Sequence, residues 1–239
     1  MKNNIKAILF DFGQTLVDAA DGFRTAEKEA QAKLFANMSL TLHADFMDNY
    51  RRIRKELHAR SNFSRILLWQ EVYFYYCLKF DESLLETWER DYWETVKKKT
   101  TLFPETLSTL KELSAKYQLG LISNTQGQRH SGTHRLSQFP ELEKYFQEII
   151  IAGENDIAPK PGPQPFHRCL QALSLKPSEA VYVGDDFRID VCGAKDVGLH
   201  AIWLQHHSVK RSWPEVETSI PIITRLDPLL DLESILDLQ

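Results

Sequence analysis

The amino-acid sequence predicts an α/β fold in which a parallel sheet carries an inserted, all-helical module. From Pro104 onward, short apolar runs alternate with amphipathic segments, the pattern of repeated βα units around a parallel sheet. Residues 23–103 contain neither glycine nor proline, which favours helices. A short apolar run at residues 5–10 precedes this stretch and has the length of a buried strand.

The strands of the core are predicted from apolar runs that turn signals bound. In chain order they lie at residues 5–10, 119–123, 148–151, 180–183 and 200–204. The amphipathic segments between them predict helices at residues 105–117, 164–173 and 189–197. The tail from Pro221 onward is expected to add a short strand and a closing helix. The first strand therefore belongs with the C-terminal half of the chain.

The block between the first strand and the rest is predicted to contain three to five helices. Residues 26–35 and 46–57 mix strong helix formers with apolar residues three and four positions apart. Residues 66–80 are richer in aromatic side chains, so that helix is expected to be covered on more than one side. The predicted domains are residues 1–17 with 102–239, and residues 18–101.

Composition and charge exclude several classes of protein. With 239 residues, 43% apolar and 26% charged, the chain has enough hydrophobic material for a sizeable core, which excludes disorder, a coiled coil and a collagen-like fibre. The net charge of −4 gives no reason to expect a nucleic acid or an anionic membrane as partner. Any anionic ligand must therefore be held locally.

Cysteine usage and the N-terminus indicate a cytoplasmic protein. The three cysteines, Cys77, Cys169 and Cys192, are widely spaced, which argues against a disulfide framework and a zinc site. They are expected to be buried, reduced thiols. The apolar run near the N-terminus is too short for a signal sequence, and no stretch approaches the length of a membrane span.

Polar side chains follow four of the predicted strands at their carboxyl ends, where open parallel sheets bind ligands. In chain order they are Asp11, Ser123 with Asn124, Lys160, and Asp185 with Asp190. Carboxylates that converge from two strand ends need a counter-charge, and a site rich in oxygen atoms is what Mg²⁺ prefers. The sequence therefore predicts a magnesium site at this edge.

Such a site suits phosphoryl transfer. Asp11, held against a cation and Lys160, is a reasonable nucleophile that would form an acyl phosphate. Ser123 would donate a hydrogen bond to a phosphoryl oxygen, and backbone amides in the turn after Asp11 could form an anion nest. Asp186 is expected to cap the helix that begins near Ile189.

Four motifs, in order, resemble those of the haloacid dehalogenase-like (HAD) hydrolase superfamily. The sequence ILFDFGQTL at residues 8–16 resembles the first motif. The second, third and fourth are similar to LISN at 121–124, Lys160-Pro161 with Pro165-Phe166, and GDDFRID at 184–190. The helical block has the position of the family's helical cap. The resemblance implies a Rossmann-like HAD core at residues 1–17 and 102–239, with a cap at 18–101.

The resemblance also implies roles for the strand-end residues. The implied catalytic residues are Asp11 as nucleophile, with Ser123 and Lys160 to orient the phosphoryl group. Substrate binding is implied for Ser123, Asn124 and Lys160. The implied ligands of Mg²⁺ are Asp11, the backbone carbonyl of Gly13, Asp185 and, in support, Asp190.

Gly13 departs from the family pattern. Phosphatases of the family carry a second aspartate at this position, which protonates the leaving group and then activates water. Such general acid–base catalysis typically contributes about 10²–10⁴-fold, so turnover by the usual mechanism is put in doubt.

The leading hypothesis is a magnesium-dependent phosphatase that acts on a small phosphorylated metabolite. A catalytically weakened phosphate-binding or regulatory relative is the first alternative. A dehalogenase that forms an ester at Asp11 is another, although the metal pair of Asp185 and Asp190 counts against it. A phosphonatase-type hydrolase would need a cap lysine, for which the candidates are Lys28, Lys33 and Lys55. Candidate substrate contacts in the cap are Arg51, Arg52, Arg54, Arg60, Arg65 and Trp69.

Overall fold

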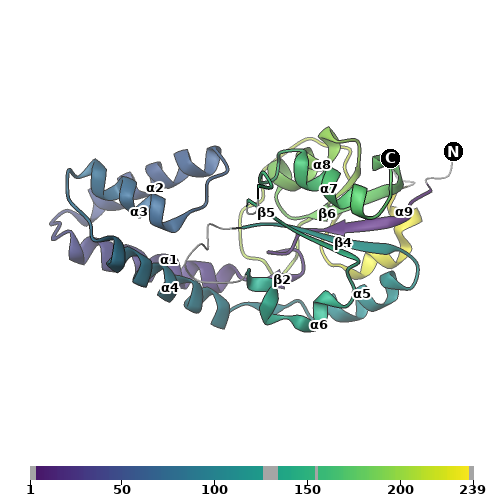
Figure 1. Ribbon diagram of the computed structural model, residues 1–239, viewed down its shortest axis with the longest axis horizontal. Coiled ribbons are helices and arrows are strands. Elements are labelled where there is room, and N and C mark those ends of the chain that lie inside the picture. Colours follow the sequence, from purple (N-terminus) through teal and green to yellow (C-terminus); the bar gives the residue numbers. More distant parts are fainter. Residues whose placement is uncertain (1–3, 126–133, 154–155, 237–239) are drawn as a thin grey trace. The chain divides into compact units, whose positions relative to one another are not determined.

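The computed structural model describes residues 4–125, 134–153 and 156–236 (Figure 1). The chain divides into two compact units. The core unit contains the described residues up to Ala20, Thr101–Asn124 and those from Arg135 onward. The helical unit contains Asp21–Thr100 together with Thr125 and His134. The assignment of residues 18–101 as a cap domain stays a prediction.

The core unit is built on a parallel sheet. Its strands, in spatial order, are β5 (Glu148–Ala152), β4 (Gln118–Asn124), β1 (Ala7–Phe10), β6 (Ala180–Gly184), β7 (His200–Leu204) and β8 (Ile222–Ile223). All neighbouring strands in the sheet run parallel. The predicted α/β fold class is therefore confirmed, and the tail supplies the edge strand β8. The carboxyl ends of β1, β4 and β6 lie together at one edge of the sheet.

Helices cover both faces of this sheet (Figure 1). One face packs against α5 (Thr106–Ser114), α6 (Pro140–Glu143), the 3₁₀ turn η4 (Asp227–Asp231) and α9 (Leu232–Leu236). The other packs against α7 (Gln164–Ala172) and α8 (Gly193–Asp196). In β1, Ile8 and Phe10 belong to the first layer, and Ala7 and Leu9 to the second. This double burial explains why the strands are continuous apolar runs.

The segment predicted as a helix at residues 189–197 is not a regular α-helix in its first part. A π-helical turn, η3 (Phe187–Cys192), precedes α8. The amide of Val191 donates to the carbonyl of Asp186, five residues earlier, at 3.3 Å. The side chain of Asp186 accepts from the amide of Ile189 at 2.9 Å, so the predicted cap is confirmed. Turns of this kind often occur at functional sites.

The helical unit consists of α1 (Ala20–Asn37), α2 (His43–Ala59), α3 (Arg65–Tyr75) and α4 (Glu82–Lys98), within the predicted range of three to five helices. Their shared interior is rich in aromatic side chains, among them Phe46, Tyr50, Trp69 and Trp93. Ser64 and Asp81 cap α3 and α4 by accepting hydrogen bonds from backbone amides. The described helices include none with the length and hydrophobicity that crossing a bilayer requires.

Short structures complete the fold. The strands β2 (Val17–Asp18) and β3 (Thr101–Leu102) pair antiparallel at the two borders of the helical segment. The 3₁₀ turns η1 (Arg135–Gln138) and η2 (Pro177–Glu179) lie in the loops of the core unit. Cys169 is buried as expected, but Cys77, which follows α3 in a turn with φ of 53°, is exposed, and Cys192 is only half-buried.

Candidate active site

Three carboxylates converge at the carboxyl edge of the sheet. Asp11 follows β1, Asp185 follows the adjacent strand β6, and Asp190 lies on η3. One oxygen atom of each lies within 4.8 Å of the others. All three residues are buried, at 8%, 6% and 2% exposure respectively. The structure thus brings together the carboxylates that the sequence singled out.

Lys160 binds this group from within the protein. Its Nζ donates to Oδ1 of Asp11 and to Oδ1 of Asp190, both at 2.7 Å, and to the hydroxyl of Tyr182 at 2.6 Å. An ammonium group has three donors, so all of them are used. Tyr182 is not among the residues predicted from the sequence, and its hydroxyl also donates to the carbonyl of Ile122 at 3.0 Å. The position of Tyr182 inside an apolar strand gave no signal of this contact.

Asn124 holds the loop that carries Lys160. Its amide oxygen accepts from the backbone N–H of Lys160 at 2.8 Å, and its amide nitrogen donates to the Lys160 carbonyl at 3.0 Å. Both ends of the amide are therefore engaged in positioning Lys160. Ser123, the preceding residue of β4, is 3% exposed. Substrate binding by Ser123 and Asn124 stays a prediction.

The glycine that ends β6 makes room for Asp190. A Cβ atom at Gly184 would lie 2.4 Å from the Cβ of Asp190 and 2.6 Å from its Oδ2. These distances are too short for any side chain, so only glycine permits this approach. The Oδ2 of Asp190 also accepts from the backbone N–H of Asp186 at 3.0 Å.

Gly13 lies beside a buried arginine. A Cβ atom at this position would lie 3.2 Å from Nη2 of Arg135. Arg135 is 2% exposed, and its guanidinium lies over the ring of Phe12, 5.5 Å from the centroid. Among the described residues, Gln14 rather than Gly13 has the positive φ of the turn, at 60°. The backbone at Gly13 therefore permits a side chain, and the space that such a side chain would enter borders a guanidinium group.

A second arginine contacts Asp185. Nη1 of Arg211 lies 2.7 Å from Oδ2 of Asp185, and Nη2 donates to the Asp185 carbonyl at 2.7 Å. Arg211 is not predicted from the sequence, because it lies in a polar loop without a motif. That the carbonyl of Gly13 contributes a metal ligand stays a prediction.

Burial dominates the electrostatics of the site. It raises the pKa of Asp11 to about 6, although Lys160 acts in the opposite direction. It also raises the pKa of Asp185 well above its ordinary value, despite the neighbouring Arg211. Burial alone would lower the pKa of Lys160, but the charges of Asp11 and Asp190 outweigh it and raise that pKa. The lysine is therefore charged, whereas the charges of Asp11 and Asp185 are incompletely compensated.

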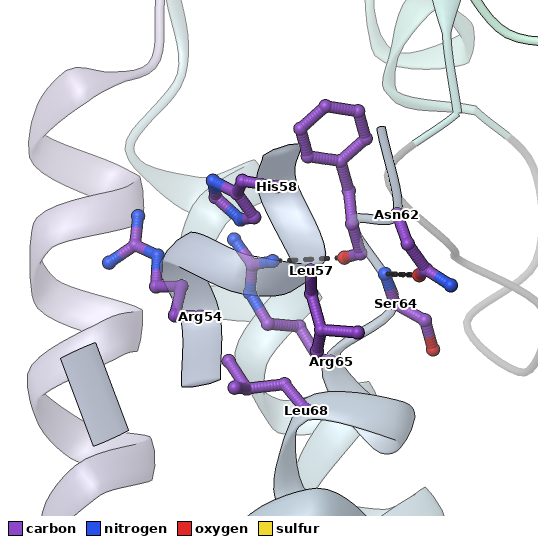
Figure 2. A pocket seen from close by; sticks show the side chains of 8 residues that line it. Arg54, Leu57, His58, Asn62, Ser64, Arg65 and Leu68 are labelled. Carbon is purple, nitrogen blue, oxygen red and sulfur yellow. Dashed lines mark hydrogen bonds between the residues drawn. The ribbon is translucent and has the colours of Figure 1, made fainter. Parts of the chain in front are cut away.

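The helical unit has a small pocket of its own (Figure 2). It is lined by residues that include Arg54, His58 and Arg65. Arg65 is 3% exposed and lies 3.6 Å from Glu27, and Trp69 is fully buried. Both are interior residues of the helical unit, and their role as substrate contacts stays a prediction.

Comparisons with known proteins identify relatives of the whole chain. The family model described as haloacid dehalogenase-like hydrolase matches residues 8–204. A glyceraldehyde 3-phosphate phosphatase of Methanothermobacter thermautotrophicus is 27% identical, covering 97% of this chain and all of that protein. An N-acylneuraminate-9-phosphatase of Rattus norvegicus is 23% identical, covering 84% of this chain and 83% of that protein.

A solved structure shares the fold. A HAD-hydrolase of Bacillus subtilis, determined with bound magnesium, superimposes with a TM-score of 0.65. It is 21% identical and covers 97% of this chain and 99% of that chain. The family match spans the strand ends where Asp11, Lys160, Asp185 and Asp190 converge. The chain is therefore a hydrolase that belongs to the haloacid dehalogenase-like hydrolase family.

Proposed function

We propose that the protein is a magnesium-dependent phosphatase that acts on a small phosphorylated metabolite through an aspartyl phosphate at Asp11. The observation that carries this proposal is the convergence of three buried carboxylates on one buried lysine at the carboxyl edge of the sheet. A nucleophile, a phosphate-binding cation and a set of hard oxygen ligands are thereby present in one place.

The donor set fits a magnesium ion. Lys160 contacts Asp11 and Asp190, and Arg211 contacts Asp185. The raised pKa values of Asp11 and Asp185 indicate that these cations do not compensate the carboxylates fully. Asp11, Asp185 and Asp190 would hold the ion, which would supply positive charge to the phosphoryl oxygens. The magnesium bound in the Bacillus subtilis relative supports this assignment.

The chain's own groups then define the reaction. An oxygen of Asp11 attacks phosphorus, which forms the acyl phosphate and breaks the bond to the ester oxygen. The positive charge of Lys160, whose ammonium group contacts Asp11 directly, stabilises the negative charge on the transferring group. Water hydrolyses the acyl phosphate, which releases inorganic phosphate and restores the Asp11 carboxylate. The raised pKa of Asp11 fits a carboxylate that gains by binding a cation before it reacts.

This mechanism needs a donor for the proton that the leaving group takes up. Gly13 has no side chain to donate it, and Arg135 beside it is a poor acid because a guanidinium stays protonated. These two residues favour a second candidate, a phosphate-binding relative with low turnover. Both candidates share the metal and phosphate site and differ in rate.

The names of the two related phosphatases support a proposal for the substrate class. The two phosphatases act, by name, on glyceraldehyde 3-phosphate and on an N-acylneuraminate 9-phosphate. Both substrates are phosphoric monoesters of small sugar-like compounds, so we place the substrate in that class. The cytoplasmic location expected from the sequence stays a prediction.

The test measures metal binding and turnover separately. Calorimetry with Mg²⁺ compares the unmodified protein with Asp185→Asn, and Asp196→Asn serves as the control because Asp196 is exposed on α8. We expect Asp185→Asn to lose Mg²⁺ affinity and the control to keep it. The value of kcat/KM is measured for p-nitrophenyl phosphate and for glyceraldehyde 3-phosphate, with Mg²⁺ and with EDTA.

The outcomes separate the two candidates. Magnesium-dependent hydrolysis of both substrates supports the phosphatase. Hydrolysis of the aryl ester alone supports the weakened relative, because p-nitrophenolate leaves without a proton. Equal Mg²⁺ affinity in Asp185→Asn and the unmodified protein would contradict the metal assignment for both.

A further inference from the structure

The loop between β7 and β8 reaches back to the proposed metal centre. It spans 17 residues, 205–221, without regular secondary structure. Connections of this length are uncommon in compact folds and usually carry a function. Near its middle it places Arg211 against Asp185.

Contacts among four residues, Asp185, Arg211, Trp213 and Trp203, form a closed ring. The guanidinium of Arg211 binds both the carboxylate and the carbonyl of Asp185, each at 2.7 Å. The same guanidinium lies 3.8 Å from the ring centroid of Trp213, within cation–π distance. Trp213 packs edge-on against Trp203 with centroids 6.2 Å apart. The indole N–H of Trp203 donates to the same Asp185 carbonyl at 2.9 Å.

This arrangement pairs a buried anion with a cation that has access to solvent. The side chain of Asp185 is 8% exposed, whereas that of Arg211 is 35% exposed. A carboxylate buried without a partner is costly, so Arg211 stabilises the metal-free state. Because the guanidinium comes from a solvent-facing loop, it can leave without a rearrangement of the sheet.

A divalent cation at the three carboxylates would meet this guanidinium. One carboxylate oxygen each of Asp11, Asp185 and Asp190 lies within 4.8 Å of the others, and Arg211 contacts the carboxylate of Asp185. Two cations on one carboxylate repel each other strongly where little water separates them. Arg211 and the metal ion therefore compete for Asp185.

We infer that Arg211 is the internal counter-cation of Asp185 in the metal-free protein, and that a divalent cation displaces it from the carboxylate. Arg211 is thus a positioning residue that sets the metal affinity of the site. The inference rests on the metal centre of the proposed function.

Calorimetry with Mg²⁺ alone tests this competition. Arg211→Met removes the charge and keeps much of the side-chain length, and we expect it to bind Mg²⁺ at least about tenfold more tightly than the unmodified protein. Arg211→Lys keeps the charge but loses the two-pronged contact, so its affinity should fall between the two. Arg168→Met is the control, because Arg168 is exposed on α7 of the same unit.

Tryptophan fluorescence gives an independent signal. Displacement of the guanidinium removes the cation from the face of Trp213, so Mg²⁺ should change the emission of the unmodified protein. That change should be absent in Trp213→Phe and strongly reduced in Arg211→Met. If Arg211→Met does not fold, Trp213→Leu takes its place in the calorimetry, with tighter Mg²⁺ binding again expected because the guanidinium loses its support.

The outcomes distinguish failure of the competition between Arg211 and the metal ion from failure of the proposed metal centre. Equal or weaker Mg²⁺ affinity in Arg211→Met, with binding intact in the unmodified protein, overturns the competition and leaves the metal centre standing. If none of these proteins binds Mg²⁺, the metal centre of the proposed function is wrong, and the inference falls with it.

Discussion

Buried carboxylates occur in both units of the molecule, in opposite electrostatic settings. In the core unit, Asp11 shares a buried site with two other carboxylates, and burial raises its pKa to about 6. In the helical unit, Glu27 is also buried, but it faces Arg54 at 3.3 Å and Arg65 at 3.6 Å. Burial alone would raise the pKa of Glu27, yet the two arginines hold it below its ordinary value.

The contacts of Arg65 show how the helical unit stabilises its charges. The guanidinium donates to the carbonyl of Phe63 at 2.9 Å, a bond drawn in Figure 2, and lies 4.9 Å from the ring centroid of Tyr92. The hydroxyl of Tyr92 donates to Glu27 at 3.1 Å. The fold itself therefore supplies this carboxylate with two cations and a hydrogen-bond donor.

The opposite pKa shifts of Glu27 and Asp11 distinguish a structural ion cluster from a reactive one. Lowering of a pKa by excess positive charge means that folding stabilises the ionised carboxylate. Raising of a pKa by burial means that the carboxylate would gain from a further cation or a reacting group. The direction of the shift, rather than burial as such, points to the site at Asp11.

The largest expected effect concerns turnover. Asp11→Asn should lower kcat/KM for p-nitrophenyl phosphate on the order of 10⁴–10⁶-fold, because the nucleophile is lost. Glu27→Gln, assayed at a temperature where it is folded, should change kcat/KM less than about threefold. Full activity in Asp11→Asn would remove this aspartate from the mechanism.

The next effect concerns the stability of the helical cluster. Glu27→Gln should lower the free energy of unfolding by about 3 kcal/mol at neutral pH, because Arg65 loses its buried partner. Since the folded pKa of Glu27 lies below its ordinary value of 4.5, this stabilisation is present above that pH and is lost as the pH falls through the folded pKa. Urea denaturation at several pH values measures it.

The control for this prediction is Glu71→Gln, at an exposed position of α3. It should leave the free energy of unfolding within about 0.5 kcal/mol of the unmodified protein. A Glu27→Gln variant as stable as this control would show that the cluster contributes nothing to folding.

Asp11→Asn is expected to change the free energy of unfolding in the opposite direction to Glu27→Gln. Without metal, Asp11→Asn should raise the free energy of unfolding by about 2–3 kcal/mol above pH 7, because the pKa of Asp11 rises from 3.8 to about 6 on folding. A carboxyl group with a raised folded pKa binds protons more tightly in the folded state, so its cost grows as the pH rises from about 4 to 6.

Urea denaturation in EDTA across this pH range provides the measurement. The curves of the variant and the unmodified protein should converge near pH 4, where the carboxyl group is protonated in the folded state. A destabilised Asp11→Asn at neutral pH would place Asp11 in the same class as Glu27.

The smallest effect concerns Gly13. Gly13→Asp should raise the turnover of an alkyl phosphate less than about tenfold, although general acid catalysis typically supplies about 10²–10⁴-fold. The new carboxylate would pair with Arg135, whose Nη2 lies 3.2 Å from the Cβ position, and this pairing would lower its pKa and weaken it as an acid.

The double variant Gly13→Asp with Arg135→Met sharpens this prediction. Removal of the guanidinium should give the aspartate a higher pKa and a larger gain in kcat than Gly13→Asp alone. A gain above about 100-fold in the single variant would show that Arg135 does not restrain an acid at this position.

Sequence periodicity was sufficient for the framework of the core unit. The strands β1, β4, β6 and β7 were predictable because each is an apolar run buried on both faces, and the edge strand β5 because it is an apolar run, although it is only partly buried. The positions of Asp11, Lys160 and Asp185 followed from the same reasoning, since parallel strands present their carboxyl ends at one edge. The π-helical form of η3 was not predictable, because apolar spacing does not distinguish it from an α-helix.

Contacts between distant segments were decided only by the tertiary structure. Nothing local marks Tyr182, Arg135 or Arg211 as neighbours of the site, since their partners lie far away in the chain. The engagement of both ends of the Asn124 amide with Lys160 was equally hidden. The sequence by itself determined which chemical groups stand at the strand ends, because periodicity is local. Which charges face one another, and hence which pKa values shift and in which direction, depends on burial and distance, and these exist only in the folded chain.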